Sequence, residues 1–430
     1  MRMVTYIARR ALLVPPVLIG VVTITFILFA SLPPAYQLVG YFGSPTPKEK
    51  CGYEAVCSCS TLNSPSIHNG TCTCISPPVV VSPPTALCTN PTFQYYYNKL
   101  GLNKPVYVQW GTYIYRTFTL KWGTVSYNST VGKDIPPLDG KPVATAIAWE
   151  LPYTAELAGL SLLFILAIAI PLGNASAVNR NRPIDQLARV MSFSGYALPA
   201  FLLGSLVVAG VVLLLLPHTG FLVKTPWCRV GEGITEELTY SLPPTPACYV
   251  GLALGQDYPA WVANGIHSTP TGFFTIDAAI HGNDWLALDS LVRIILPALV
   301  IAYGTIALLL RFVRNSMLEV MNLDYVRTAR AGGVPERVVV NRHAGRNSLN
   351  ATVTVLGLTF ASFLGGFPII EDVFHLNGVG NMLAQAANPN PGLDYGVLFG
   401  STLLFTFLFV AANLIVDVLY AYLDPRVRLG

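Results

Sequence analysis

The chain has 430 residues, of which 53% are hydrophobic and only 11% carry a charge, whereas soluble globular chains carry about 25% charged residues. Together with a mean hydropathy of +0.52, this composition excludes a soluble globular enzyme, a disordered chain and a nucleic-acid-binding protein. Most of the chain must face lipid or line a helical bundle inside a membrane. The net charge of +4 is small and indicates little about partners.

Six stretches of the sequence lack charged residues and approach or exceed the roughly 20 residues that a helix needs to cross a membrane. They lie at 11–47, 157–179, 190–223, 294–310, 347–370 and 395–416. The fourth is short, but Arg293 and Arg311 at its ends can snorkel, which extends the span to about 290–312. The sequence therefore predicts an all-α polytopic membrane protein with six transmembrane helices, and an even number of spans places both termini on one side.

A cleaved signal peptide is the alternative to a retained first helix. The basic start of the chain and the small residues Ala30 and Ser31 after the apolar run fit that alternative. The run of about 20 apolar residues is longer than the 7–15 residues of a signal-peptide core, however, and this favours a retained first span.

The arginines are distributed unevenly between the two sides of the predicted helices. Fifteen of the 18 fall on one side: three before the first span, three between the second and third, seven between the fourth and fifth, and two after the sixth. The positive-inside rule assigns this side to the cytoplasm. The sequence thus predicts a multi-pass protein of the cell membrane with both termini in the cytoplasm, while all 8 lysines fall in outer segments.

Five segments follow from these assignments. They are an N-terminal region with the first span at 1–31, an outer loop at 32–148, the second and third spans at 149–216, a second outer loop at 217–289, and the last three spans at 290–430. The last segment includes a charged cytoplasmic hairpin at 316–346.

All eight cysteines fall in the two outer loops. The first loop holds Cys51, Cys57, Cys59, Cys72, Cys74 and Cys88, and the second holds Cys228 and Cys248. An oxidising exterior favours disulfide bonds, so the first loop is expected to be a Cys-rich insert dominated by loops. The second loop allows only one pair, Cys228–Cys248, whereas six cysteines allow 15 connectivities, which the sequence leaves open.

A tetrahedral zinc site is the alternative for the two Cys-x-Cys pairs, Cys57 with Cys59 and Cys72 with Cys74. Only His68 accompanies them, and the compartment is oxidising, so disulfides are favoured. The six histidines of the chain show no metal-ligand spacing, and we assign neither a metal nor another cofactor.

The most charged stretch of the chain lies between the fourth and fifth spans, at 311–350. Its pattern predicts a helix through Leu318–Ala331, stopped by Gly332 and Gly333, and a second helix that starts at Pro335, where proline suits a first helical turn. Such a solvated hairpin offers a surface that a soluble partner can push. A plain basic loop that binds anionic lipid is the alternative.

The hairpin sequence closely resembles the conserved cytoplasmic loop of ABC-importer permeases, particularly the dipeptide, oligopeptide and nickel branch. Residues 325–331 read YVRTARA, followed by a glycine two residues later and a histidine ten residues after that. The acidic first residue of the general EAA-x3-G pattern is replaced by Arg327, a departure that is typical of this branch. The resemblance implies that the hairpin docks on an ATPase through Tyr325, Arg327, Thr328, Ala329, Arg330, Ala331, Gly333 and His343.

The resemblance extends beyond the hairpin. It includes the segment Leu100–Trp110 before the second span, Glu371 with its neighbouring glycines after the fifth span, and Asn413, Asp417 and Asp424 at the end of the chain. The stretches at about 35–92 and 224–285 have no counterpart in the family pattern, and we interpret them as insertions.

The resemblance implies the ABC type I importer permease fold and a non-catalytic subunit of a larger machine. The implied partners are a second homologous permease subunit, two cytoplasmic ABC ATPase subunits and an extracytoplasmic solute-binding protein, all assembled in membrane lipid. The chain has no Walker A loop, which agrees with ATP hydrolysis by partner subunits. Closure of the ATPases would drive alternating access, and the implied substrates are peptides, nickel or, as in some relatives, oligosaccharides.

Polar residues in the last span are expected to face other helices, because charged groups in lipid are costly. Asn413 and Asp417 are one helical turn apart and line either the pore or an interhelical contact, of which the contact is favoured. Glu371 follows the fifth span beside several glycines, a pattern that fits a re-entrant loop, and both a pore contact and a structural cap are compatible with it.

Two other classes of protein share part of this pattern. An autonomous secondary transporter or channel commonly shows an inverted repeat of spans, which we do not find in this sequence, and needs no soluble hairpin. A surface adhesion or sensor protein would use the Cys-rich insert, but six spans exceed what an anchor requires. The sequence therefore favours the permease subunit of an ATP-driven importer.

Overall fold

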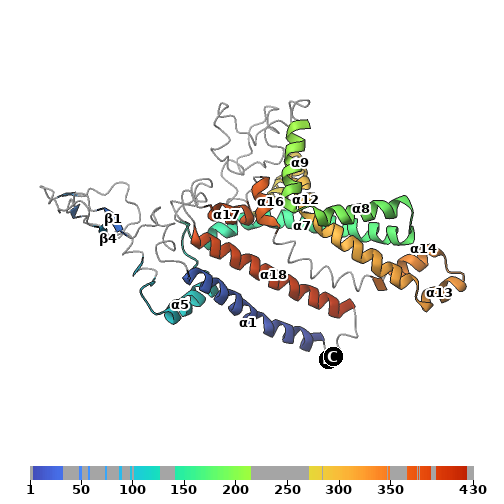
Figure 1. The fold of residues 1–430 in the computed structure, drawn as a ribbon, viewed down its shortest axis with the longest axis horizontal. Helices are drawn as coiled ribbons and strands as arrows, with labels where there is room; N and C mark the ends of the chain where they lie inside the picture. Colours follow the sequence, from blue (N-terminus) through green and yellow to red (C-terminus); the bar gives the residue numbers. More distant parts are fainter. Residues whose placement is uncertain are drawn as a thin grey trace.

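The computed structural model is a bundle of long helices with a small hairpin at one end and short paired strands at the other (Figure 1). The residues that it describes are 3–31, 48–50, 57–58, 73–74, 87–89, 97–98, 101–125, 141–214, 271–282, 284–345, 347–348, 366–374, 376, 378–388 and 394–423. Most described residues are helical, and the described strands form two short antiparallel pairs. The predicted all-α membrane architecture is confirmed at this level.

Two long helices form the centre of the bundle. Helix α7 spans Val143–Val178 and α12 spans Asp284–Met321. Thirty-eight residues at 1.5 Å each make α12 about 57 Å long, well beyond the roughly 30 Å of a hydrocarbon layer, so its ends project into water. The helices approach closely at Gly173, where a Cβ would lie 2.7 Å from Val313 Cγ1.

A large apolar cluster forms the core between these helices. Leu157 and Ile165 of α7 belong to the same apolar cluster as Leu309 and Leu310 of α12, and all four are almost completely buried. Helix α16, Phe367–Val373, packs on this core, with Phe367, Ile370 and the following Phe374 fully buried against it. The short helix α17, Val379–Ala386, continues from α16 and joins a second cluster around Val143, Ile147 and Val397.

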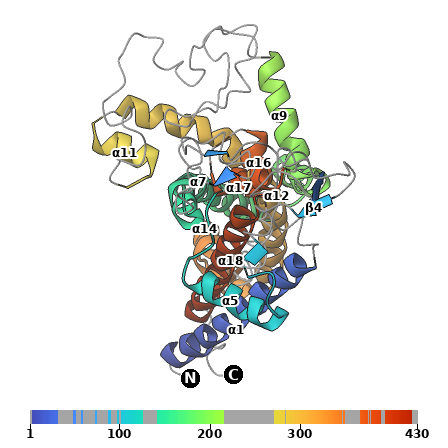
Figure 2. The same ribbon diagram turned by 90° about the vertical axis from the view of Figure 1, so that its left-hand side faces the viewer.

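The third predicted span is broken rather than continuous. Helix α8, Pro183–Ala197, is followed by α9, Ala200–Leu214, and the two meet at an angle of 105°. The break falls at Leu198–Pro199, because a residue before proline is driven out of the helical conformation, and Leu198 is extended. The described part of the predicted span at 190–223 is therefore sharply bent, and α9 projects away from the bundle (Figures 1 and 2).

The first and last spans lie side by side. Helix α1, Met3–Ala30, runs antiparallel to α18, Tyr395–Leu423, and the Phe29 ring packs on Tyr395 and Phe399 at centroid distances of 5.4 and 4.8 Å. Helix α5, Val106–Phe118, packs on α1, where Trp110 Nε1 donates to Thr23 Oγ1 at 3.1 Å. The short helix α11, Phe274–Ile280, packs on the beginning of α12.

The described strands belong to the predicted Cys-rich insert. Strand β1, Lys48–Lys50, pairs with β4, Leu87–Thr89, and β2, Cys57–Ser58, pairs with β3, Thr73–Cys74. In the second pair Cys57 lies directly opposite Cys74 in the register. The other cysteines except Cys88 of β4 lie outside the described residues, and so does the whole segment 215–270.

Four described helices are long and apolar enough to cross a membrane: α1, α7, α12 and α18. The bent pair α8–α9 would add a fifth. The fifth predicted span, 347–370, lies mostly outside the described residues, so six spans stay a prediction.

Candidate coupling surface

The candidate site is the hairpin that follows α12. Helix α12 ends at Met321, and α13, Asp324–Ala331, begins after a two-residue break. The prediction of one helix through Leu318–Ala331 is therefore wrong: its first turn belongs to α12. The helix is interrupted where Leu323 adopts an extended conformation. The turn there lets Val326 of α13 pack back onto the end of α12.

The turn of the hairpin and its second helix match the sequence prediction. Gly333 has φ of +76°, a left-handed conformation that side chains disfavour, which explains the glycine. Pro335 caps α14, Glu336–Val338, and a π-helical turn at Val339–Ala344 continues it. Arg330 forms a bidentate ion pair with Glu336 across the turn, with Nη2 donating to Oε1 at 2.7 Å and Nε to Oε2 at 3.1 Å. This contact lowers the pKa of the Glu336 carboxyl.

A small apolar core fixes the hairpin to the bundle. Val326 of α13 and Val339 of the π-helical turn are fully buried against Met317 of α12. Ala177, near the end of α7, belongs to the same cluster. The hairpin is thus packed against both central helices rather than tethered loosely to one.

Most of the residues predicted to dock lie on the water-facing side of the hairpin. Arg327 is exposed, and its ion pair with Asp324 is long, 3.6 Å from Nη1 to Oδ1. Tyr325 is also exposed, and its hydroxyl donates to the His343 carbonyl at 3.4 Å, which joins the two arms of the hairpin. Four of the remaining predicted docking residues are exposed: Thr328, Arg330, Ala331 and Gly333. The other two, Ala329 and His343, are half-buried.

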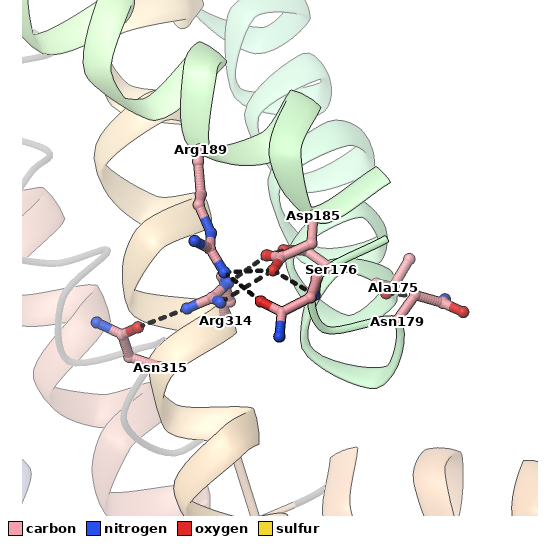
Figure 3. A network of polar contacts seen from close by, with 8 residues as sticks. Ala175, Ser176, Asn179, Asp185, Arg189, Arg314 and Asn315 are labelled. Carbon is pink, nitrogen blue, oxygen red and sulfur yellow. Dashed lines mark hydrogen bonds and ion pairs between the residues drawn. The ribbon is translucent and has the colours of Figure 1, made fainter. Parts of the chain in front are cut away.

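A buried ionic network lies beside the hairpin, and sequence reasoning missed it (Figure 3). Asp185, in the first turn of α8, is fully buried. Its Oδ1 accepts from Arg314 Nε of α12 and from Ser176 Oγ of α7, both at 2.7 Å. Its Oδ2 accepts from Arg189 Nη2 at 2.6 Å, from Arg314 Nη2 at 3.2 Å and from the Asn181 N–H at 2.9 Å. The sequence offered one hint, an acidic residue in an otherwise basic short loop.

Glu371 makes the contacts of a structural cap. It is buried in α16, where Oε1 accepts from Thr154 Oγ1 and Oε2 from the Asn381 N–H, both at 2.9 Å. The Gly380 N–H also donates to it. Residue 378 is glycine because a Cβ there would collide with the carboxylate. These contacts bind α16 to the start of α17 and to α7, and they leave the predicted pore contact untested.

A second acidic side chain lies near this cap. Glu150 of α7 is 4% exposed, and its Oε2 has no hydrogen-bond partner among the described residues. The carboxylate of Glu371 repels it. Sequence reasoning missed Glu150 as well, although a glutamate inside a long apolar helix is the available signal.

The predicted polar stripe of the last span is only partly described. Asn413 Nδ2 donates to the Phe409 carbonyl of its own helix at 2.9 Å. The side chain of Asp417 lies outside the described residues, so the role of the pair stays a prediction. Among the described residues, no group of three or more histidine, cysteine or acidic side chains could hold a metal ion.

Comparison with known proteins identifies the class of molecule that this bundle and hairpin define. Residues 169–429 match the family model of the binding-protein-dependent transport system inner membrane component. The chain belongs to this family, the permeases of ABC importers, and within it to the peptide-transport branch. The predicted family is thus confirmed, as is its multi-pass inner-membrane character.

Particular relatives make the branch clear. The chain is 34% identical over 332 residues, 77% of its length and 83% of the relative's, to the probable D,D-dipeptide transport system permease protein DdpB of Escherichia coli K12. It is 31% identical over 331 residues, again 77% and 83% of the two chains, to the dipeptide transport system permease protein DppB of the same strain. It is also 29% identical over 430 residues, 99% of this chain and 100% of the relative, to DppB of Alkalihalophilus pseudofirmus.

Proposed function

We propose that this chain forms half of the membrane channel of an ATP-driven importer of peptides. A second homologous permease supplies the other half, two ABC ATPases dock from the cytoplasm, and an extracytoplasmic binding protein delivers the solute. The chain binds no ATP itself, and its role is to convert closure of the ATPases into opening of the channel towards alternate sides.

The observation that carries this proposal is the exposed hairpin at the end of a rigid helix. Arg327, Thr328 and Ala331 face water on a short helix whose opposite face is fixed by the buried Val326. A surface that is both exposed and firmly packed from behind can receive a partner and transmit its movement. A lipid-binding basic loop, the alternative, does not need this packed support.

The path from the hairpin into the membrane is continuous. Helix α12 runs without a break from the hairpin through the centre of the bundle, where α7 packs along it. A displacement of α13 is therefore passed to α12 through Met317 and Val320, and not absorbed by a flexible linker. This geometry supports rigid-body movement of the spans as the coupling mechanism.

Peptides are the favoured substrate over oligosaccharides, because relatives across three quarters or more of the chain are named dipeptide and oligopeptide permeases. Neither substrate is distinguished by the described residues of this chain. Oligosaccharides stay in the test as the second solute class.

The test is uptake by membrane vesicles or proteoliposomes that contain this chain with its neighbouring permease, ATPases and binding protein. We expect labelled di- and oligopeptides to accumulate only when ATP is hydrolysed. Accumulation that continues with an ATPase catalytic-site variant would contradict an ATP-driven importer. Uptake of oligosaccharides in place of peptides would contradict the proposed substrate class but would agree with the proposed mechanism.

A further inference from the structure

The Asp185 network links three helices at one point beside the hairpin. A carboxylate offers about four lone-pair sites, and five donor contacts from α7, the α7–α8 turn, α8 and α12 occupy them. Of these donors, Arg314 alone comes from α12, and it reaches Asp185 through two nitrogen atoms (Figure 3). Arg314 is therefore the ionic bridge between α12 and the α7–α8 corner.

The location of this bridge is mechanically informative. Arg314 lies about two turns before the end of α12, three residues ahead of Met317 in the hairpin core. On the other side Ser176, which also binds Asp185, precedes Ala177 of the same core. The hairpin, the end of α12 and the α7–α8 corner are thus joined by both apolar and ionic contacts.

A second set of contacts fixes the far end of α8 to α12. The hydroxyls of Ser194 and Tyr303 lie 2.5 Å apart, and Gly195 is so close to Ala307 that a Cβ would collide. With Asp185 at one end and Ser194 at the other, α8 is held along its length against α12. The two helices are built to move together.

Helix α8 leads onward to the outer side. After the 105° break, α9 packs on α16, where a Cβ at Gly204 would lie 3.2 Å from Ile370 Cδ1. Helix α16 carries Glu371 and its cap. A physical chain of contacts therefore runs from the hairpin through α12 and α8 to α9 and α16.

We propose that Asp185 and Arg314 are positioning residues that make α8 follow α12 when the hairpin is moved. The inference rests on the proposed importer function and adds the place where movement passes from α12 to α8. We call this place, the Asp185–Arg314 ion pair, the coupling joint. Without the ion pair, α12 responds to the ATPases while α8 lags behind, so ATP is hydrolysed with less transport. A buried charge that loses its partner also destabilises the fold, so the test must separate the two effects.

The chain offers a matched control for this separation. Arg189 also binds Asp185, but it is four residues away on the same helix and its side chain is 46% exposed. Arg189→Gln removes one contact and one positive charge from Asp185 without cutting the link between α8 and α12. Arg314→Gln removes the same charge and does cut the link.

The experiment measures solute transported per ATP hydrolysed in proteoliposomes that hold the full importer. For Arg314→Gln we expect this ratio to fall on the order of fivefold, the lower end of the usual range for coupled sites, while ATP hydrolysis continues. Arg189→Gln should retain the wild-type ratio. Arg314→Lys, which keeps the charge but loses the two-nitrogen contact, should give an intermediate ratio and provides the test if Arg314→Gln does not assemble.

Each outcome has a definite meaning. An unchanged ratio of transport to ATP hydrolysis in both Arg314 variants would contradict the coupling role and leave a purely structural network. An equal fall of this ratio in the Arg189 control would do the same. A parallel loss of hydrolysis and transport at constant ratio would do the same. Absence of ATP-dependent uptake by the wild-type importer would instead contradict the proposed function, so failures of the two proposals are distinguishable.

Discussion

At the scale of single residues, two buried glutamates near the end of the bundle opposite the hairpin have opposite surroundings. Glu371 accepts from a hydroxyl and from two backbone N–H groups, so its charge is compensated by donors on α7 and α17. Glu150 has a buried oxygen without a hydrogen-bond partner among the described residues, and it faces repulsion from Glu371. The Glu371 carboxyl group therefore stabilises the fold, whereas the Glu150 carboxyl group does not.

This contrast predicts different effects of the same substitution. Glu371→Gln replaces an acceptor by an NH2 group that points at other donors, and the unsatisfied contacts should cost about 1–3 kcal/mol. Glu150→Gln removes a buried carboxyl group that has an unpaired oxygen and faces Glu371, so it should leave the melting temperature unchanged or raise it. Thermal unfolding of the two variants in detergent compares them directly. A larger loss of stability in Glu150→Gln than in Glu371→Gln would refute this assignment of roles.

At the scale of elements, the long helices could be predicted because lipid forces the backbone to satisfy its own hydrogen bonds, so an apolar run of sufficient length has few alternatives. Pro199 marks the position of the bend in the third span, but the 105° angle could not be predicted, since α9 contacts a helix, α16, that lies far away in the sequence. The Asp185–Arg314 bridge joins positions 129 residues apart. Pairing at that separation has no local pattern to reveal it.

The hairpin turn allows a test of docking that is independent of backbone strain. Gly333 and Gly282 share φ values of +76° and +73°, and a Cβ at either position would have no other atom within 4 Å. An aspartate should cost a similar amount, about 1–2 kcal/mol, at either place. We expect Gly333→Asp to abolish ATP-dependent uptake while the spans stay folded, and Gly282→Asp to preserve uptake. Normal uptake by Gly333→Asp, measured in the same vesicles, would argue against docking at this turn.

The strand register narrows the open question of disulfide connectivity in the first outer loop. Directly opposite residues of an antiparallel pair have Cα atoms roughly 4.5–5.5 Å apart, which suits a disulfide, and Cys57 occupies such a position opposite Cys74. We expect peptide mapping of the non-reduced protein to recover a Cys57–Cys74 link, and Cys228 linked to Cys248. Thiol labelling of all eight cysteines without prior reduction would instead show that the loop carries no disulfides.

At the scale of the whole molecule, two arginine-bearing segments that the sequence assigns to the cytoplasm lie at the same end of the bundle. The α7–α8 corner with Arg182 and the hairpin with Arg327 and Arg330 lie together there, and the strands of the Cys-rich insert lie at the opposite end (Figure 1). The arginine distribution and the cysteine distribution thus indicate the same orientation by independent arguments, one from membrane insertion and one from redox chemistry. Only a cytoplasmic hairpin can meet an ATPase.

Reporter fusions test this orientation directly. A phosphatase that needs disulfides should be active when fused after Lys121, because that junction follows α5 in the predicted outer loop, and inactive when fused after Gly333 in the hairpin. A fluorescent protein that matures only in the cytoplasm should give the reverse pattern at the same two junctions. Because the junctions flank an odd number of predicted spans, they must report opposite sides if the topology is correct. Phosphatase activity at Gly333 would show that the predicted orientation is reversed. It would contradict the docking surface, the Asp185–Arg314 coupling contact and the disulfide-bonded loop together, since all three depend on that orientation.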